Sequence, residues 1–173
     1  MALSGDRPLF NYTTLRWLFV PVAALHNFEE WLMFQAYAEA TVRAAARLDL
    51  RVATPAWNTL QAALLLATLV PALAVIAAAT GRPSVRKESV VAFCVSIFLV
   101  NVFLPHIFAA VWMRGYAPGV VTAVGINLPF ALFYYQQGVR EGILTKRSIM
   151  LGIVLATVAL VGAGAFVIRA SIE

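Results

Sequence analysis

Five apolar segments, each close to the length needed to cross a bilayer, follow one another along the chain. The hydrocarbon core takes ~20 helical residues, and the candidate spans are Leu15–Ala36, Asn58–Thr80, Ser89–Met113, Ala117–Gln136 and Ser148–Ile168. The chain is 62% hydrophobic and 12% charged, whereas soluble domains are roughly 45–50% apolar and 25% charged. No alternating pattern of ten-residue strands competes with helices. We therefore predict one all-α domain over residues 1–173, an integral-membrane helical bundle of about five transmembrane helices.

The basic residues indicate how this bundle is oriented. The net charge is +5, and with a cytoplasmic N-terminus eight of the thirteen Lys and Arg lie on the cytoplasmic side: Arg7, Arg16, Arg82, Arg86, Lys87, Arg140, Lys146 and Arg147. Cytoplasmic loops carry an excess of Lys and Arg. The basicity thus predicts a membrane orientation and no nucleic-acid partner. The N-terminal segment lacks a short apolar run with a small-residue cleavage site, so we expect no cleaved signal peptide.

Two further segments have patterns that predict packing rather than chemistry. The connection between the first two spans carries Arg43, Arg47 and Arg51 at four-residue spacing, which predicts a surface helix that ends before Pro55. In the last span, Gly152 and Ala156, or Ala159 and Ala163, provide small faces for close helix contact. The lone cysteine, Cys94, lies in the middle of a span and is interpreted as apolar filler.

The stretch HNFEEW, residues 26–31, places two carboxylates inside the first span. Of eight acidic residues, only Glu29 and Glu30 fall within a span. A charged side chain at mid-membrane costs roughly 2.5–3.5 kcal/mol even on the lenient insertion scale. The pair therefore needs partners, protons, water or a metal ion.

Both histidines of the chain lie in spans as well. His26 precedes Glu29 by three residues and Glu30 by four, so the three share one side of a helix. His106 follows Pro105 in the third span, where the proline is expected to bend the helix. At ~1.5 Å per residue, the polar groups of these spans, including Asn127, come out about 9–15 Å below the outer surface. We expect them to share one pocket.

The residue types indicate a metal site. Two histidines and one carboxylate are the protein ligands of many catalytic zinc sites, and the same set also binds non-haem Fe(II). We predict His26, His106 and Glu30 as ligands, with Glu29 as a further ligand or as the general base. Asn101 and Asn127 are predicted to support the cofactor. The spans offer only two carboxylates, which favours one zinc ion, with iron next, over a carboxylate-bridged di-iron centre.

The residues HNFEEW in the first span, NVFLPH in the third and PGVVTAVGINLP at the start of the fourth resemble a small bacterial membrane family named for its H-x-x-E-E motif. The resemblance covers roughly residues 15–135. It implies that His26, Glu29, Glu30 and His106 matter, and it implies a bacterial cytoplasmic membrane, without supplying a reaction. FEEWLMF also resembles, more weakly, the acid-base motif of membrane lycopene cyclases, although the proline usual before the pair is missing.

Three functions fit these features. The first is a membrane-embedded metalloenzyme acting on a lipophilic small molecule, by metal-activated water or by iron-dependent oxidation. The second is a metal-independent isomerase or cyclase of an isoprenoid-like substrate, in which Glu29 and Glu30 share a proton. The third is a proton or metal-ion transporter, for which five spans are few unless the chain forms an oligomer. Membrane lipid is an expected partner in each case.

Overall fold

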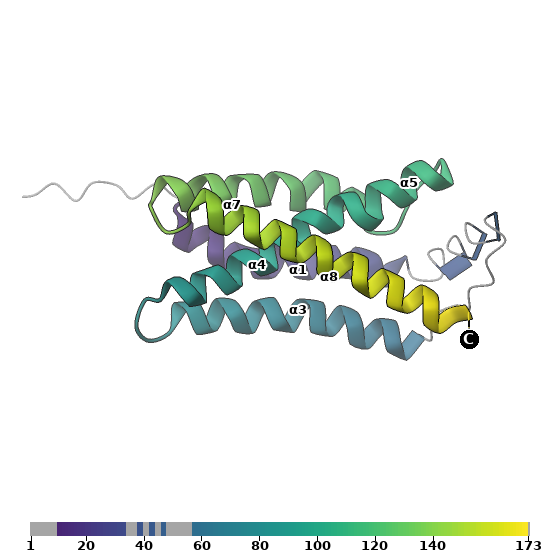
Figure 1. The fold of residues 1–173 in the computed structure, drawn as a ribbon, viewed down its shortest axis with the longest axis horizontal. Coiled ribbons are helices and arrows are strands. Elements are labelled where there is room, and N and C mark those ends of the chain that lie inside the picture. The colour runs from purple at the N-terminus through teal and green to yellow at the C-terminus, as the bar shows by residue number, and fades with distance from the viewer. Residues whose placement is uncertain (1–9, 34–37, 40–41, 44–45, 48–56, 173) are drawn as a thin grey trace, which may run out of the picture.

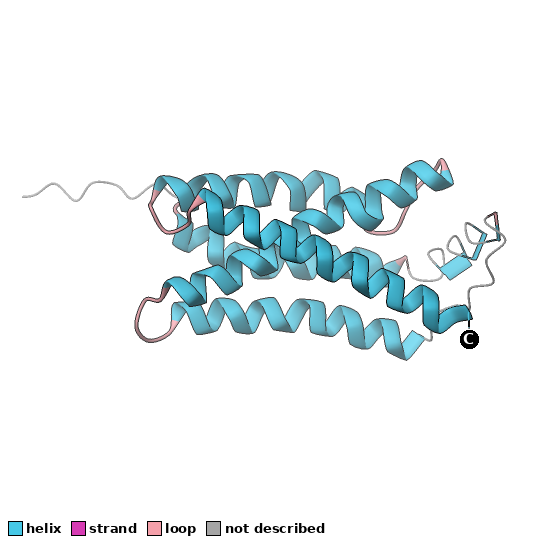
Figure 2. Cartoon of the chain, viewed as in Figure 1, coloured by secondary structure: helices cyan, strands magenta, loops and turns pink. Residues whose placement is uncertain are grey.

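The protein is entirely helical over the residues that the structure describes. A computed structural model describes residues 10–33, 38–39, 42–43, 46–47 and 57–172. Within these ranges the chain forms helices and turns and no strand (Figure 2). The predicted helix between the first two spans, with Arg51 and Pro55, lies largely outside the described residues, as do positions 34–36 of the first predicted span.

Five helical rods run along the long axis of the molecule (Figure 1). The first is α1 (Tyr12–Leu32) and the second is α3 (Trp57–Ala79). The third joins α4 (Val85–Asn101), η1 (Val102–Ile107) and α5 (Phe108–Met113). The fourth joins α6 (Val120–Thr122), η2 (Ala123–Asn127) and α7 (Leu128–Arg140), and the fifth is α8 (Lys146–Ile172). The turns from α3 to α4 and from α7 to α8 lie at one end, whereas α5 and α8 end at the other (Figure 1).

Three of these rods are long and apolar enough to cross a membrane, fewer than the five predicted. They cover Asn58–Ala79, Val85–Met113 and Lys146–Ala165. The other two rods are more polar. α1 carries Arg16 as well as the histidine and both carboxylates of the motif, and α7 ends in two glutamines and an arginine. The two rods that do not meet the length and hydropathy requirements are therefore rods that carry polar side chains.

The sequence of α1 explains both its start and its inward face. The side chain of Asn11 accepts a hydrogen bond from the amide of Thr14 at 2.9 Å, which caps the helix. Its buried residues follow at three- and four-residue spacing and place one stripe against the bundle: Tyr12, Leu15, Phe19, Ala23 and His26.

An aromatic layer fills the bundle beneath His26. Phe19 meets Phe98 edge-on at 5.3 Å between ring centroids and stacks on Phe130 at 5.9 Å. Phe98 in turn meets the His26 ring edge-on at 5.8 Å. Phe19 is fully buried and Phe98 nearly so. The histidine therefore stands on a packed apolar floor.

The third rod is broken at Leu104, where φ is −126° and ψ is 109°. Pro105 follows this residue, as expected for a proline that removes a backbone donor and bends its helix. The break lets α5 diverge from the line of α4 (Figure 1) and sets His106 on the inner side, where it is 2% exposed.

The last rod uses one of its two small faces to pack against α4. A Cβ added at Gly152 would lie 2.7 Å from Ser96 Oγ, and Ala156 is fully buried. Ala159 and Ala163 are exposed. The Gly152–Ala156 face therefore makes the close contact, and the alternative face does not.

At the end away from the motif, a polar cluster joins three rods. We call Tyr12, Arg16, Glu88 and Tyr134 the terminal cluster. Arg16 Nη1 lies 2.5 Å from Glu88 Oε1. The Tyr12 hydroxyl donates to Glu88 Oε2 at 3.0 Å and lies 2.6 Å from the Tyr134 hydroxyl, which must then be the donor between the two phenols.

Candidate metal centre

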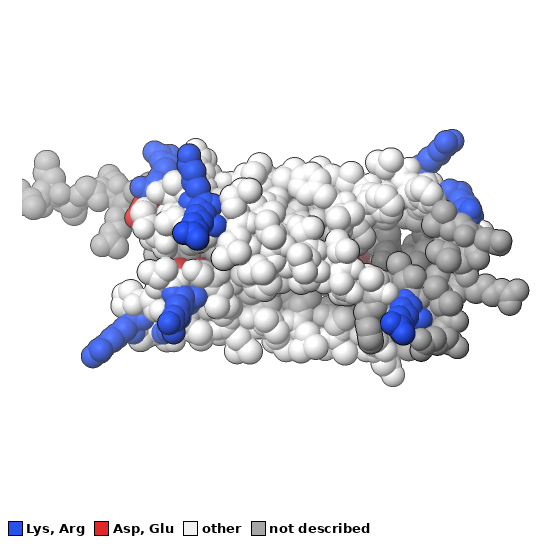
Figure 3. Space-filling view, viewed as in Figure 1, with Lys and Arg blue, Asp and Glu red and all other residues white. Residues whose placement is uncertain are grey.

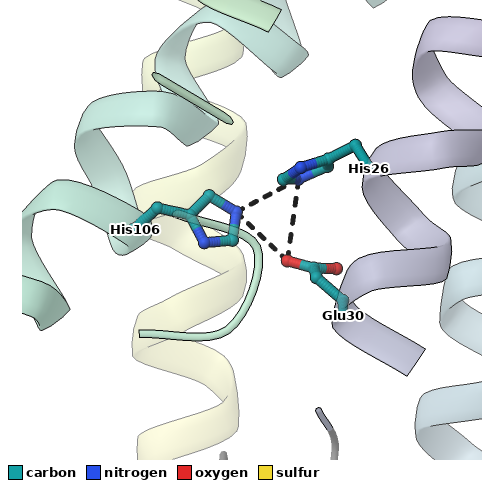
Figure 4. A group of neighbouring side chains, drawn as sticks. All are labelled: His26, Glu30 and His106. Carbon is teal, nitrogen blue, oxygen red and sulfur yellow. Dashed lines mark hydrogen bonds and ion pairs between the residues drawn. The ribbon is translucent and has the colours of Figure 1, made fainter. Parts of the chain in front are cut away.

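Three predicted side chains converge in the structure: His26 and Glu30 from α1 and His106 from η1 (Figure 4). His106 Nε2 lies 3.2 Å from His26 Nε2 and 3.1 Å from Glu30 Oε1. His26 Nε2 lies 3.7 Å from the same carboxylate oxygen. Both imidazoles are buried, and the Glu30 side chain is 23% exposed. We call these residues the triad.

The hydrogen bonds behind His26 determine which of its nitrogens carries the proton. Its Nδ1 lies 2.8 Å from Thr122 Oγ1. The single hydroxyl proton of Thr122 is donated to Glu29 Oε2 at 2.5 Å, so the hydroxyl oxygen must accept from His26 Nδ1–H. The lone pair of neutral His26 then lies on Nε2, toward the triad.

The second imidazole is oriented in the same way by a backbone group. His106 Nδ1 lies 2.8 Å from the carbonyl oxygen of Pro118. A carbonyl only accepts, so Nδ1 donates and the lone pair of neutral His106 also lies on Nε2. Three acceptor atoms, two imidazole nitrogens and a carboxylate oxygen, therefore face one point. Such a group needs a cation or hydrogen-bond donors, and the Asn101 amide nitrogen lies within hydrogen-bonding distance of both imidazole Nε2 atoms.

The predicted supporting residues Asn101 and Asn127 differ in their placement. Asn101 Nδ2 lies 2.9 Å from His106 Nε2 and 3.2 Å from His26 Nε2, so its amide sits directly on the triad. Asn127 is 1% exposed, and neither polar atom of its side chain has a hydrogen-bond partner among the described residues. Within that part of the chain, no hydrogen bond joins Asn127 to the triad.

The other carboxylate of the motif, Glu29, binds the start of the fourth rod instead of the triad. Its Oε2 accepts from both the backbone amide and the hydroxyl of Thr122, at 2.8 and 2.5 Å. Its Oε1 accepts from the Tyr116 hydroxyl at 2.5 Å. Burial and this hydrogen bond raise the pKa of Tyr116 to about 12, so the phenol remains a donor at neutral pH. A carboxylate at a helix N-terminus is stabilised by the free amides there.

Gly119 makes room for the triad at the same turn. Its φ is +78°, in the left-handed region, and a Cβ added there would lie 2.6 Å from His106 Cε1 and 2.9 Å from Glu30 Cγ. Only glycine satisfies both the backbone conformation and this close approach. The loop residue therefore determines how near the two ligand-bearing rods come to each other.

A cavity of about 280 Å³ adjoins the triad. Its polar lining comes from Glu30, Asn101 and Asn27. The rest is mostly apolar and is contributed by α3, α4, α8 and Pro118, through Leu60, Ala63, Leu64, Ala67, Ile97, Phe98 and Leu160. The triad thus borders a space lined mainly by hydrocarbon.

The residues behind the triad were not identified as functional from the sequence. Thr122, Pro118 and Gly119 contact it from a loop, and Tyr116 was expected only to lie at the membrane surface. Gly115, Pro118 and Gly119 mark a tight turn. This turn lies far from HNFEEW in the sequence, so no local pattern indicates that the two meet. In the sequence analysis, the PGVVT segment was noted only as part of the resemblance to a family.

Comparison with known proteins gives a family and no activity. No curated protein matches the chain, and no solved structure does. The likeness to lycopene cyclases therefore finds no support. Residues 17–134 match the family described as "Protein of unknown function with HXXEE motif". This match covers more than half of the chain and includes His26, both carboxylates and His106. The chain therefore belongs to this HXXEE family.

Proposed function

We propose that the protein is a membrane-embedded metalloenzyme that acts on a lipophilic small molecule, with hydrolysis as the preferred reaction. The proposal includes five membrane spans, with α1 and the fourth rod crossing as well. It also includes a bacterial cytoplasmic membrane with the N-terminus inside. The observation that carries it is the convergence of three acceptor atoms, of which the two imidazole nitrogens are oriented from behind by Thr122 and Pro118.

The spacing of the triad accommodates a metal ion. Zinc–ligand bonds of about 2.0–2.1 Å at tetrahedral angles place neighbouring ligand atoms about 3.3 Å apart. The observed separations are 3.1, 3.2 and 3.7 Å. Zinc is preferred because two histidines and one carboxylate are the protein ligands of many catalytic zinc sites, with iron as the alternative.

The hydrogen bonds behind the ligands also have the form typical of metal sites. A metal-ligating histidine usually donates its other N–H to a carbonyl or carboxylate, which fixes the ring and its tautomer. His106 donates to the Pro118 carbonyl, and His26 donates to Thr122, which donates to Glu29. We therefore assign Glu29 as a positioning residue that acts through Thr122, in place of the general base predicted from sequence.

A zinc ion held by the triad would supply a Lewis acid that polarises a substrate carbonyl and lowers the pKa of a water molecule. The Asn101 amide, which lies next to both imidazoles, would orient the oxygen that reacts. The mainly apolar cavity excludes bulk water and accepts a lipophilic substrate. In this proposal, residues of the chain bind the metal ion and the substrate, orient the reacting oxygen and exclude bulk water.

Metal analysis of purified full-length protein tests the proposal. After purification in detergent without chelators, we expect about one zinc ion per chain, and its loss in His26→Ala, His106→Ala and Glu30→Gln. The adjacent isosteric change Glu29→Gln is the matched control. It should keep zinc, with affinity lowered by about 10–100-fold as for other changes behind the ligands. A metal-free wild type, or equal losses in Glu29→Gln and Glu30→Gln, would contradict the proposal.

One observation favours a second candidate, a metal-independent acid-base isomerase or cyclase. The 3.1 Å between His106 Nε2 and Glu30 Oε1 is also the length of a hydrogen bond. In that case a proton shared by these two atoms replaces the ion. Histidine nitrogen NMR separates the two readings, because a shared proton gives a protonated Nε2 signal in metal-free protein, whereas zinc gives a metal-bound one. Glu29 and Glu30 have different partners, so the proton would not be shared between the two carboxylates.

A further inference from the structure

The cavity beside the triad has one polar end and one apolar body. Glu30 and Asn101, at the polar end, belong to the triad or touch it. Asn27 joins them there and uses its Nδ2 to donate to Thr68 Oγ1 at 2.7 Å. No hydrogen bond from the described residues reaches the Asn27 amide oxygen. The polar end therefore offers an acceptor besides the carboxylate.

The apolar body is formed by one face of α3 and by residues of α4 and α8. Leu60, Ala63, Leu64 and Ala67 have the spacing of a single helix face, and Phe98 and Leu160 complete the wall. At about 280 Å³, the space is at the lower limit of the ~300–1,000 Å³ of ligand pockets. It suits one hydrocarbon chain better than two.

The charges of the chain restrict the head group. Among the described residues, no lysine or arginine lines the cavity, and the basic side chains in view gather at the two ends of the molecule (Figure 3). Phosphate and carboxylate groups are usually bound by Arg or Lys. The carboxylate of Glu30, which repels an anion, is the one charged side chain that the described part of the chain contributes to the polar end. The lining therefore suits an uncharged head group that contains oxygen.

The cavity lies where lipid could enter from the side. α3 and α8 both pack against α4 and both contribute to the wall. Figure 3 shows a largely uncharged band between the two charged ends of the molecule, and α8 runs along it in the same view of Figure 1. A membrane-dissolved molecule reaching this band would not have to pass through water.

We propose that the cavity binds a single-chain amphiphile whose uncharged head group can donate a hydrogen bond, such as a long-chain alcohol. The head lies at Glu30 and Asn101, and the tail lies between α3, α4 and α8. This ligand class deepens the proposed function and rests on it for the reaction. Binding of the chain itself rests only on the cavity.

Photolabelling tests the ligand class. Full-length protein in lipid nanodiscs is labelled with a diazirine analogue of hexadecanol, and the labelled residues are mapped by mass spectrometry. We expect labels at Leu60–Ala67 and near Phe98, which unlabelled hexadecanol should reduce at least fivefold. Diazirine analogues of palmitic acid and of phosphatidylcholine should label only the outer faces of the helices. Equal cavity labelling by the fatty acid or by the two-chain lipid would overturn the proposal.

A pair of variants on α3 controls for non-specific contact. Ala67→Phe fills the cavity and should lower the specific hexadecanol label at least fivefold. Ala62→Phe makes the same change on the exposed outer side of α3 and should leave the label unchanged. An equal effect of the two variants would also overturn the proposal.

Each sample is labelled with and without chelator, and its zinc content is measured. Cavity labelling in samples that were never exposed to chelator and yet contain no metal would support the ligand class and contradict the metalloenzyme. Zinc binding by the triad without cavity labelling would do the reverse. The two failures are therefore distinguishable.

Discussion

Adjacent carboxylates on a helix point about 100° apart, and HNFEEW uses this difference. Glu30 faces the two imidazoles, whereas Glu29 faces the amide and hydroxyl of Thr122. The meeting of His26, Glu30 and His106 could be anticipated because depth in a span follows from residue count. The partner of Glu29 could not, because Thr122 lies ninety-three residues away and in a different rod. Glu30 faces the candidate centre. Glu29 binds Thr122 of the fourth rod, and Thr122 in turn orients the His26 ring.

Gly119 is the residue whose change should disturb the candidate centre most selectively. In Gly119→Ala, the new Cβ meets His106 Cε1 at 2.6 Å and Glu30 Cγ at 2.9 Å, so the triad must open. We expect zinc affinity to fall at least tenfold, together with a loss of about 1–2 kcal/mol in stability from the left-handed backbone. Zinc titration and thermal unfolding of the purified variant measure both effects.

Gly142→Ala is the matched control for this change. Gly142 also has a positive φ, +71°, but nothing lies within 4 Å of an added Cβ. This variant should lose similar stability and keep its zinc affinity. If both variants lost zinc equally, backbone strain, and not contact with the triad, would explain the effect.

At the scale of the helices, single residues predicted some packing features well. Pro105 indicated the bend in the third rod. Gly152 with Ala156, one of the two small faces predicted in the last span, makes the close contact of α8, although its partner α4 was not predicted. The terminal cluster was not predicted from the sequence, because Glu88 and Tyr134 lie far from each other and from α1 along the chain. Both are instead brought together with α1 by tertiary packing, to which local sequence patterns are blind.

The terminal cluster should contribute strongly to the stability of the bundle. The side chains of Arg16 and Glu88 are only 11% and 14% exposed. Glu88→Ala leaves the arginine without its carboxylate in a buried position, which is expected to destabilise the protein by about 3–5 kcal/mol. The midpoint of thermal unfolding in detergent should fall accordingly. Combining this change with Arg16→Met should recover much of the loss.

An exposed ion pair provides the comparison. Glu39 and Arg43 lie 3.2 Å apart with side chains 70% and 65% exposed, and such pairs contribute little. Glu39→Ala should leave the unfolding midpoint at the wild-type value. A Glu88→Ala variant as stable as Glu39→Ala would show that the terminal cluster does not hold the rods together.

For the whole molecule, charge and apolar surface divide along the long axis. Blue side chains gather at both ends and leave a broad uncharged band between them (Figure 3). Composition predicted the all-helical class and the apolar character. Hydropathy alone supports three spans. α1 is more polar because it carries Arg16, His26 and both carboxylates, and α7 because it ends in two glutamines and an arginine. Five spans remain a proposal.

Cysteine labelling tests the proposed orientation. In a Cys94→Ser background, which removes the lone buried cysteine, Arg82→Cys and Arg114→Cys place a thiol in exposed turns at opposite ends of the third rod. A membrane-impermeant maleimide added to intact cells should label the Arg114 position alone, and the Arg82 position only after the cells are opened. The reverse pattern would indicate an inverted protein, and labelling of both in intact cells would contradict a spanning bundle.

The aromatic layer beneath His26 restricts how substrate and product can reach and leave the candidate centre. Phe19, Phe98 and Phe130 fill the bundle on the side of His26 that faces the terminal cluster. Substrate and product of the proposed enzyme are therefore expected to enter and leave on the other side of this layer. In the proposed enzyme, departing product and arriving substrate would then compete for one passage, and turnover should slow as product accumulates in the surrounding bilayer.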